Sequence, residues 1–320
     1  MQGTALVTGA AGFIGANLVR RLVGDGLDVH VTANDGGKDD TEAWRLADVT
    51  PLETHVCSVA DADAVHALVR SVRPRWVFHL AAHGAYSHQT DQARMVAVNT
   101  LGTFNLLDAL ARSDGCEGFV HTGSSSEYGL KDHAPAEDEA VAPDSVYAIT
   151  KCAATHAVSY WARHTGLPAS TVRLYSVYGR WEDPTRLIPR LVMAALHGSL
   201  PPLVEPSTAR DFVWIDDAVD GIVAAARTAT RHPGAVWNLG SGVQTTLEEL
   251  VAVARAVFGV LEEPKWSSMA NRAWDTDRWI ADPRLARDEL GWETRTGLDA
   301  GLRATGEWLS ATAERARYEE

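Results

Sequence analysis

The chain has 320 residues, of which 46% are hydrophobic and 22% are charged. This composition predicts a globular protein with a substantial core, and no apolar run is long enough to cross a bilayer. The formal charge of −13 disfavours nucleic acid or an anionic membrane as a partner.

The first predicted elements are a strand, a glycine turn and a helix. Residues 5–8 form the strand, glycines stand at 9, 12 and 15, and the apolar spacing of residues 16–23 is helical. The backbone N–H groups of such a turn and the positive end of the helix can hold a pyrophosphate. The spacing Gly-x-x-Gly-x-x-Gly is one residue longer than the commonest fingerprint, but its context predicts a dinucleotide site.

The second predicted strand, residues 28–32, runs into Asn34 and Asp35. Either side chain could hold the hydroxyls of the adenosine ribose, which favours NAD as the cofactor. No arginine directly follows this strand to pair with a 2′-phosphate, and Lys38 is the nearest cation. NADP remains an alternative.

Strands and helices continue to alternate. Further strands are predicted at residues 76–80, 118–122 and 170–175, and helices at 62–72, 91–111 and 147–164. This order predicts an α/β fold with a doubly wound parallel sheet, the Rossmann arrangement.

Beyond residue 175 the pattern is less regular. Prolines interrupt a segment with one clear helix, residues 187–197, and a strand at 235–239 is expected to return to the main sheet. We therefore predict a dinucleotide-binding domain and a smaller, interleaved C-terminal substrate-binding domain. The first comprises residues 1–175 and about 213–240, and the second residues 176–212 and 241–320.

Tyr147 and Lys151 lie four residues apart on a predicted helix, so their side chains share one face. A serine-rich segment, residues 124–126, precedes them. An ammonium beside a phenol favours the phenolate and lowers its pKa, and a serine hydroxyl can hydrogen-bond an oxygen that is being oxidised or reduced. The combination predicts a proton-transfer site.

The cysteines at 57, 116 and 152 are too scattered for a disulfide framework or a zinc site, and we expect reduced thiols. His79 and His83 fall at the end of a strand, where packing or a polar loop role is favoured over metal binding. No metal site is predicted. A strand pattern begins within the first residues, so we expect no signal peptide and a cytoplasmic protein.

The glycine turn, His79-Leu-Ala-Ala82, the serine segment, Tyr147 with Lys151 and residues 210–217 together resemble the extended short-chain dehydrogenase/reductases of the NAD-dependent epimerase/dehydratase group, which act on nucleotide sugars. The resemblance spans nearly the whole chain, including residues 238–242 and 290–292. It implies that Ser124 is the catalytic hydroxyl, Tyr147 the acid/base and Lys151 its electrostatic partner. Lys151 would also hold the nicotinamide ribose.

Motifs and resemblance together give the expected contacts. The cofactor residues are Gly9, Gly12, Phe13, Ile14, Gly15, Asn34, Asp35, Ser58, Ala81, Ala82, Asn99, Tyr147 and Lys151. The residues expected to bind a nucleotide-diphosphate sugar are Ser125, Ser126, Ser176, Arg210, Arg272 and Asp275. The resemblance also implies a homodimer that pairs the helices at 91–111 and 147–164.

Sugar 4,6-dehydratases of this group resemble one another in a glutamate directly after the catalytic Ser or Thr, where this chain has Ser125 and Ser126. Glu127 comes one residue later, and in an extended segment that shift sends a side chain to the opposite face. We therefore expect hydride transfer at sugar C4, first as a 4-epimerase and alternatively as an NAD(P)H-dependent 4-keto-sugar reductase. A dehydratase or an inactive cofactor-binding protein is less favoured. Ser176 replaces the Asn usual in epimerases and favours the reductase, whereas residues 178–212 resemble the epimerase lid.

Overall fold

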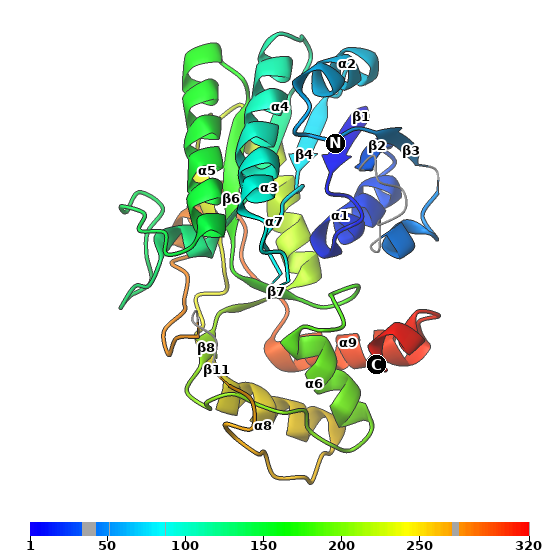
Figure 1. The fold of residues 1–320 in the computed structure, drawn as a ribbon, viewed down its shortest axis with the longest axis vertical. Coiled ribbons are helices and arrows are strands. Elements are labelled where there is room, and N and C mark those ends of the chain that lie inside the picture. The colour runs from blue at the N-terminus through cyan, green and yellow to red at the C-terminus, as the bar shows by residue number, and fades with distance from the viewer. Residues whose placement is uncertain (34–42, 51, 87, 271–274, 320) are drawn as a thin grey trace.

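The structure is a computed structural model that describes residues 1–33, 43–50, 52–86, 88–270 and 275–319. An upper lobe is built on a parallel sheet, and a smaller lower lobe of helices carries the C-terminus (Figure 1). No helix within these described ranges is long and apolar enough to span a lipid bilayer.

The main sheet has seven strands in the order β10-β6-β5-β4-β1-β2-β3, and each neighbouring pair is parallel. The strands are β1 (Thr4–Thr8), β2 (Asp28–Ala33), β3 (Glu53–Val56), β4 (Trp76–His79), β5 (Gly118–Ser124), β6 (Ala169–Leu174) and β10 (Val236–Leu239). The chain winds from β1 to β3 on one side and from β4 to β10 on the other. The carboxyl ends of β1 and β4 therefore border the crevice where such sheets bind ligands.

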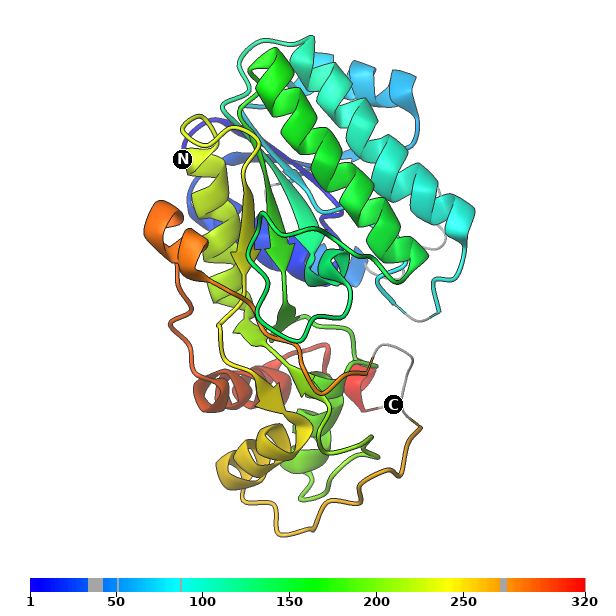
Figure 2. The same ribbon diagram turned by 90° about the vertical axis from the view of Figure 1, so that its left-hand side faces the viewer.

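Helices cover both faces of the sheet, as the alternating pattern predicts (Figure 2). One face carries α1 (Phe13–Gly24) and α7 (Ile215–Thr228), and the other carries α2 (Ala62–Val72), α4 (Gly102–Ala111) and α5 (Val146–Thr165). Successive residues of β1 serve the two layers, since Val7 packs in the core with Leu18 while Leu6 packs in the core with Leu106. The predicted doubly wound α/β fold is confirmed.

The helix predicted at residues 91–111 has an irregular middle. It consists of α3 (Gln92–Met95), a π-helical stretch η2 (Val96–Leu101) and α4. Wide turns of this kind often occur at functional sites. This one carries Asn99, one of the expected cofactor residues, at a fully buried position.

The lower lobe contains α6 (Leu187–Leu196), α8 (Leu247–Phe258) and α9 (Leu298–Ala311). Two small sheets pair β7 (Ser176–Tyr178) with β9 (Phe212–Trp214) and β8 (Ala209–Arg210) with β11 (Thr245–Thr246). Short helical turns complete the fold: η1 (Ala43–Leu46), η3 (Ser125–Tyr128), η4 (Ala286–Leu290) and η5 (Arg315–Tyr318).

Among the strands of the main sheet and the longer helices, four were not identified from the sequence: β3, α7, α8 and α9. Strand β3 reads Glu-Thr-His-Val and is largely exposed at the sheet edge, so it lacks an apolar run. Helix α8 did carry a readable signal, because Thr246 and Glu249 form a capping box at its start. The division into two domains stays a prediction.

Candidate active site

The glycine turn crosses the end of β4, which explains its composition. Gly9 has a φ of +70°, and a Cβ there would lie 2.5 Å from the backbone nitrogen of Ala81. A Cβ on Gly15 would overlap the carbonyl oxygen of Gly9. Gly12 is the N-cap of α1 and provides no side-chain cap. The N–H groups of the first helical turn, which includes Phe13 and Ile14, are thus left without a side-chain cap, and this turn fits a pyrophosphate.

Asn99 ties the loop after β4 to helix α5. Its amide group donates to the His83 carbonyl at 2.8 Å and to Thr150 Oγ1 at 2.9 Å, and its Oδ1 accepts from the His83 N–H at 2.8 Å. Since Thr150 precedes Lys151, Asn99 fixes the start of α5 against the crevice. Asn99 therefore connects the loop after β4 to α5 by hydrogen bonds.

The remaining expected cofactor residues divide into two groups. Ser58 follows β3, and Ala81 and Ala82 follow β4, so all three lie at the edge of the sheet where the parallel strands have their carboxyl ends. His79, just before them, is a buried core residue hydrogen-bonded to Thr8 and Thr103. Asn34 and Asp35 lie outside the described residues.

Ser124 and Tyr147 meet where β5 ends and α5 begins, and Lys151 follows on α5. Ser124 is the last residue of β5, and its hydroxyl is within hydrogen-bond reach of the Tyr147 phenol. Ser145 caps α5 by accepting from the Ala148 N–H at 3.2 Å, which sets Tyr147 in the first turn. Lys151 lies one turn further and is 1% exposed.

The electrostatics of this trio differ from the sequence expectation. Burial, reinforced by the Glu127 carboxylate, raises the pKa of Tyr147 to about 12, although the Ser124 hydroxyl opposes the shift. Burial also lowers the pKa of Lys151 to about 8, against the opposing effect of Glu127. The expected lowering of the Tyr147 pKa by Lys151 is therefore wrong for the protein alone, because desolvation penalises both charged groups.

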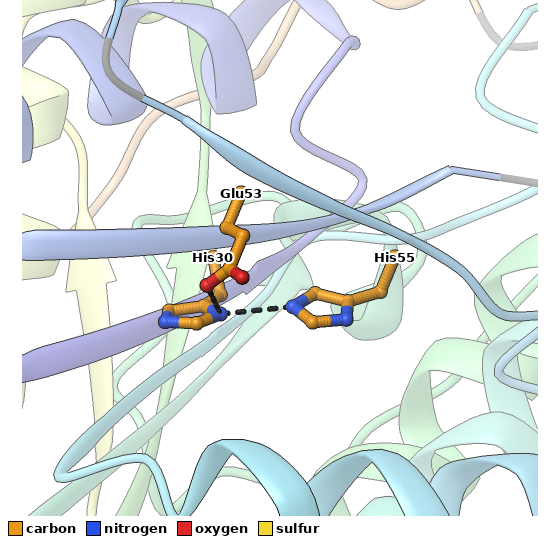
Figure 3. A group of neighbouring side chains, drawn as sticks. All are labelled: His30, Glu53 and His55. Atoms are coloured by element: carbon orange, nitrogen blue, oxygen red, sulfur yellow. Dashed lines mark hydrogen bonds and ion pairs between the residues drawn. The ribbon is translucent and has the colours of Figure 1, made fainter.

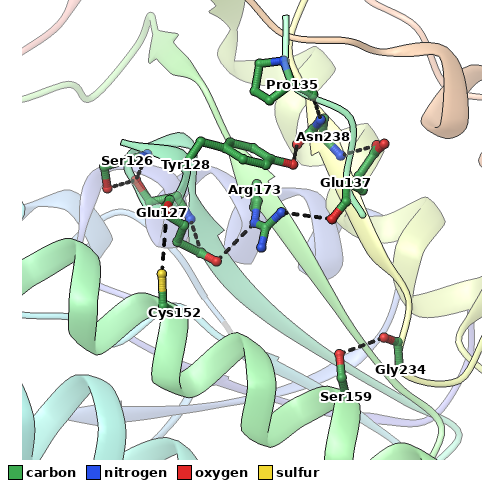
Figure 4. A network of polar contacts seen from close by, with 11 residues as sticks. Ser126, Glu127, Tyr128, Pro135, Glu137, Cys152, Ser159, Arg173, Gly234 and Asn238 are labelled. Carbon is green, nitrogen blue, oxygen red and sulfur yellow. Dashed lines mark hydrogen bonds and ion pairs between the residues drawn. The ribbon is translucent and has the colours of Figure 1, made fainter. Parts of the chain in front are cut away.

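Glu127 is buried, and its side chain is directed toward Arg173 within a polar network (Figure 4). Its Oε1 accepts from the Ser124 N–H at 2.8 Å, and its Oε2 forms an ion pair with Arg173 Nε on β6 at 3.0 Å. Both side chains of this pair are at most 4% exposed.

The local backbone corrects one premise of the sequence analysis. Residues 125–128 form the 3₁₀ turn η3 and not an extended segment. Ser124 and Glu127 are the two ends of its capping box. The spacing Ser-x-x-Glu is the known sequence signature of that motif and could have revealed the turn. Arg173, the buried partner of Glu127, carried no such signal.

The expected substrate residues lie around the trio and in the lower lobe. Ser126 Oγ is 2.7 Å from Ser124 Oγ, and Ser125 lines a small pocket together with Tyr175 and Trp279. Three more of the expected substrate residues are described, namely Ser176, Arg210 and Asp275. Ser176 begins β7, and the structure brings Arg210 and Asp275 together in an ion pair of 2.9 Å. Arg272 lies outside the described residues.

Comparison with known proteins identifies similar chains over the full length. The model of a family described as "NAD dependent epimerase/dehydratase family" matches residues 5–240. A UDP-glucose 4-epimerase of Mycolicibacterium smegmatis is 33% identical over 317 residues, which cover 95% of this chain and 97% of the relative. A dTDP-glucose 4,6-dehydratase of Streptomyces griseus is also 33% identical, over 321 residues that cover 95% and 93%.

Among solved structures, a UDP-glucuronic acid 4-epimerase from Bacillus cereus superposes with a TM-score of 0.81 at 25% identity. The match covers 95% of this chain and 98% of that chain. That crystal structure holds UDP-glucuronic acid and NAD.

Proposed function

The chain belongs to the NAD dependent epimerase/dehydratase family, and from that premise we propose that it is a nucleotide-sugar 4-epimerase. The observation that carries the proposal is the contact of Ser124 with Tyr147 at the end of β5, one helical turn before the buried Lys151, while the neighbouring carboxylate of Glu127 is held in a buried ion pair. The membership confirms the expected NAD-dependent class of enzyme.

NAD is the cofactor, and the residues that would hold it are present. The glycine turn and the side-chain-free cap of α1 suit its pyrophosphate, and Lys151 suits the nicotinamide ribose. When bound, the cofactor supplies an acceptor and donor of hydride for C4 of the sugar.

The chain's own residues would move the proton. In the epimerase, Tyr147 takes the proton of the C4 hydroxyl as that carbon is oxidised and returns it when the 4-keto sugar is reduced on the opposite face. Ser124 hydrogen-bonds the same oxygen, and the buried ammonium of Lys151 stabilises the phenolate. Because the pKa of Tyr147 is raised to about 12 in the protein alone, the phenolate depends on this support.

Dehydration needs a further acid/base group near C5 and C6, and the described part of the site offers serines there. Ser125 and Ser126 follow Ser124, and an unactivated serine is a poor acid or base near neutral pH. Glu127 cannot serve without breaking its ion pair with Arg173 and its hydrogen bond to the Ser124 N–H. This geometry favours the epimerase over the dehydratase. Sequence identity does not distinguish them, because the epimerase and the dehydratase relatives are both 33% identical to this chain.

A 4-keto-sugar reductase is the second candidate. Ser176, at the start of β7, is the observation in its favour, because epimerases of the family resemble one another in having Asn there. The reductase would use the same trio, with Tyr147 donating a proton while external NAD(P)H is consumed.

The deciding experiment incubates purified protein with UDP- and dTDP-sugars without added cofactor, followed by product analysis. An epimerase interconverts C4 epimers to a constant ratio and needs no added reductant. A dehydratase yields a 4-keto-6-deoxy sugar instead. Stoichiometric NAD(P)H loss with a 4-keto sugar, and no epimer exchange, would establish the reductase.

Tyr147→Phe is the matched variant, because it removes only the phenolic oxygen. We expect it to bind NAD as the parent does and to lose at least about a hundredfold in turnover. Turnover at the parental rate would refute the assignment of Tyr147 as the proton-transfer group.

We also propose a homodimer formed by the outer faces of η2, α4 and α5. Large apolar side chains are exposed there, led by Ile149 at 53%, Tyr160 at 52% and Leu101 at 51%. Such a face on neighbouring helices favours association with a second copy. Light scattering at micromolar concentration should give twice the mass of the chain, and a monomer would contradict the proposal.

A further inference from the structure

Three side chains gather on one face of the sheet at its edge, well away from the proposed catalytic trio. In the parallel register of β2 and β3, His30 lies opposite Glu53 and Thr32 lies opposite His55. Residues two apart on a strand share a face, so His30, Glu53 and His55 face the same way. Figure 3 shows their polar atoms directed toward a common point.

The spacing of these atoms is slightly shorter than that of metal ligands, so small side-chain movements would admit an ion. His30 Nδ1 is 2.8 Å from His55 Nε2 and 3.2 Å from Glu53 Oε2, and all three donor atoms lie within 4.8 Å of one another. Two ligands at about 2.1 Å in tetrahedral geometry are roughly 3.4 Å apart. No other group of three His, Cys, Asp or Glu side chains meets this spacing within the described ranges of the chain.

We propose that His30, Glu53 and His55 form a binding site for a divalent transition metal ion, with Zn²⁺ as the best match. Two imidazoles and one carboxylate suit Zn²⁺, whereas Mg²⁺ and Ca²⁺ prefer oxygen ligands. The ion would bind His30 through Nδ1, His55 through Nε2 and Glu53 through Oε2, and a water molecule would complete the tetrahedron.

A fourth residue orients the first ligand. Asp28 Oδ2 lies 3.3 Å from His30 Nε2, the ring nitrogen that faces away from the other two ligands. A carboxylate that accepts the Nε2 proton leaves the lone pair on Nδ1, as in the carboxylate–histidine pairs of zinc proteins. Asp28 is therefore a positioning residue for the proposed site.

Both ring nitrogens of His30 lie close to polar atoms. Nε2 is 3.3 Å from Asp28 Oδ2, and Nδ1 is 3.2 Å from Glu53 Oε2. His55 Nε2 is 2.8 Å from the same Nδ1. A cation placed between His30 Nδ1, His55 Nε2 and Glu53 Oε2 would be shared by all three atoms.

The position indicates a structural role. More than three strand spacings of about 4.8 Å separate the β2–β3 pair from β5, which carries Ser124, so the ion would lie at least about 14 Å from the trio. It would fasten the short, exposed strand β3 to β2 next to the cofactor crevice. The inference does not rest on the proposed function.

The test uses untagged full-length protein stripped with a chelator. Zinc chloride titrated in competition with a chromophoric chelator should bind at one equivalent per chain and raise the melting temperature, and magnesium chloride should do neither. Glu53→Gln and His55→Gln should each weaken zinc affinity by more than about tenfold and abolish the thermal gain. Asp28→Asn should weaken it by about tenfold.

His197→Gln is the matched control, since His197 is an exposed histidine at the C-cap of α6. Melting of every variant in chelator gives its metal-free baseline, so a general loss of stability is separated from a loss of zinc stabilisation. The proposal fails if the parent shows no zinc-dependent thermal gain. It fails equally if the gain survives in Glu53→Gln and His55→Gln, or is lost in His197→Gln.

Discussion

Removal of one partner of the buried ion pair between Glu127 and Arg173 should destabilise the upper lobe strongly. Arg173→Met keeps an unbranched apolar stem and removes the charge, which leaves the Glu127 carboxylate buried without this cationic partner. The two side chains are at most 4% exposed and meet at 3.0 Å. Removal of one partner from such a pair costs about 3–5 kcal/mol, because the remaining charge is desolvated and unpaired.

Further contacts of Arg173 point in the same direction. Its Nη1 donates to the Glu137 carbonyl at 3.2 Å, and its guanidinium lies 4.4 Å from the centre of the Tyr128 ring. Tyr128 in turn donates to Asn238 Oδ1 at 2.8 Å, so the network joins η3 to β6 and β10 (Figure 4). The loss should therefore reach the upper part of the range.

Urea unfolding followed by circular dichroism near neutral pH measures the difference. Arg75→Met is the control, because Arg75 and Glu117 form an exposed pair at 2.7 Å whose loss should cost less than about 1 kcal/mol. Adding Glu127→Gln to Arg173→Met should restore part of the stability, since it removes the stranded charge. If Arg173→Met is no more destabilising than Arg75→Met, the assignment of the pair as a buried contributor is refuted.

Three further predictions follow from single side chains. Because burial lowers the pKa of Lys151 to about 8, kcat/KM should fall as pH rises through that value. Lys151→Arg should not show this fall in kcat/KM, and a pH profile of both proteins tests the prediction. If the variant shows the same fall as the parent, Lys151 is not the group that titrates. Burial raises the pKa of Glu182 to about 8, so its ionisation destabilises the fold as pH rises from about 4.5 to 8. Glu182→Gln should therefore melt above the parent at pH 8 by a margin that vanishes near pH 4.5, and a pH-independent margin would contradict this. Gly9→Ala places a Cβ 2.5 Å from the Ala81 nitrogen, whereas Gly26→Ala, at a φ of +80°, meets nothing within 4 Å. Calorimetry should find that NAD binding is lost in Gly9→Ala and kept in Gly26→Ala. An equal loss of NAD binding in both variants would mean that backbone strain alone is responsible.

The elements that were predicted from the sequence are those whose residue types directly indicate burial or backbone conformation. Buried strands such as β1 and β4 contain short apolar runs, and the glycines of the first turn mark a close backbone approach that tolerates no Cβ. The pair Tyr147 and Lys151 could be read because four residues make one helical turn. Strand β3 gave no such signal, since its ladder partner β2 supplies the ordering and its own side chains face solvent.

The parts of the site that could not be predicted depend on contacts between distant segments. Glu127 and Arg173 are 46 residues apart and meet only because β5 and β6 are neighbours in the sheet. The direction of the Tyr147 pKa shift depends on how deeply the phenol is buried, and a spacing of four residues carries no information about depth. His30 and His55 are likewise brought together by strand register alone.

Glu127 links the stability of the site to its chemistry. Its carboxylate caps η3 through the Ser124 N–H and so fixes the serine that faces Tyr147. The same negative charge raises the pKa of Tyr147 and opposes the lowering of the Lys151 pKa, so it disfavours the phenolate and favours the ammonium. Arg173 offsets this charge from the other side at 3.0 Å. A chain that instead directed this carboxylate toward the substrate would gain an acid/base group beside Ser124. It would also lose the cap on η3 and the ion pair with Arg173, so the present arrangement fits the proposed proton transfer by Tyr147.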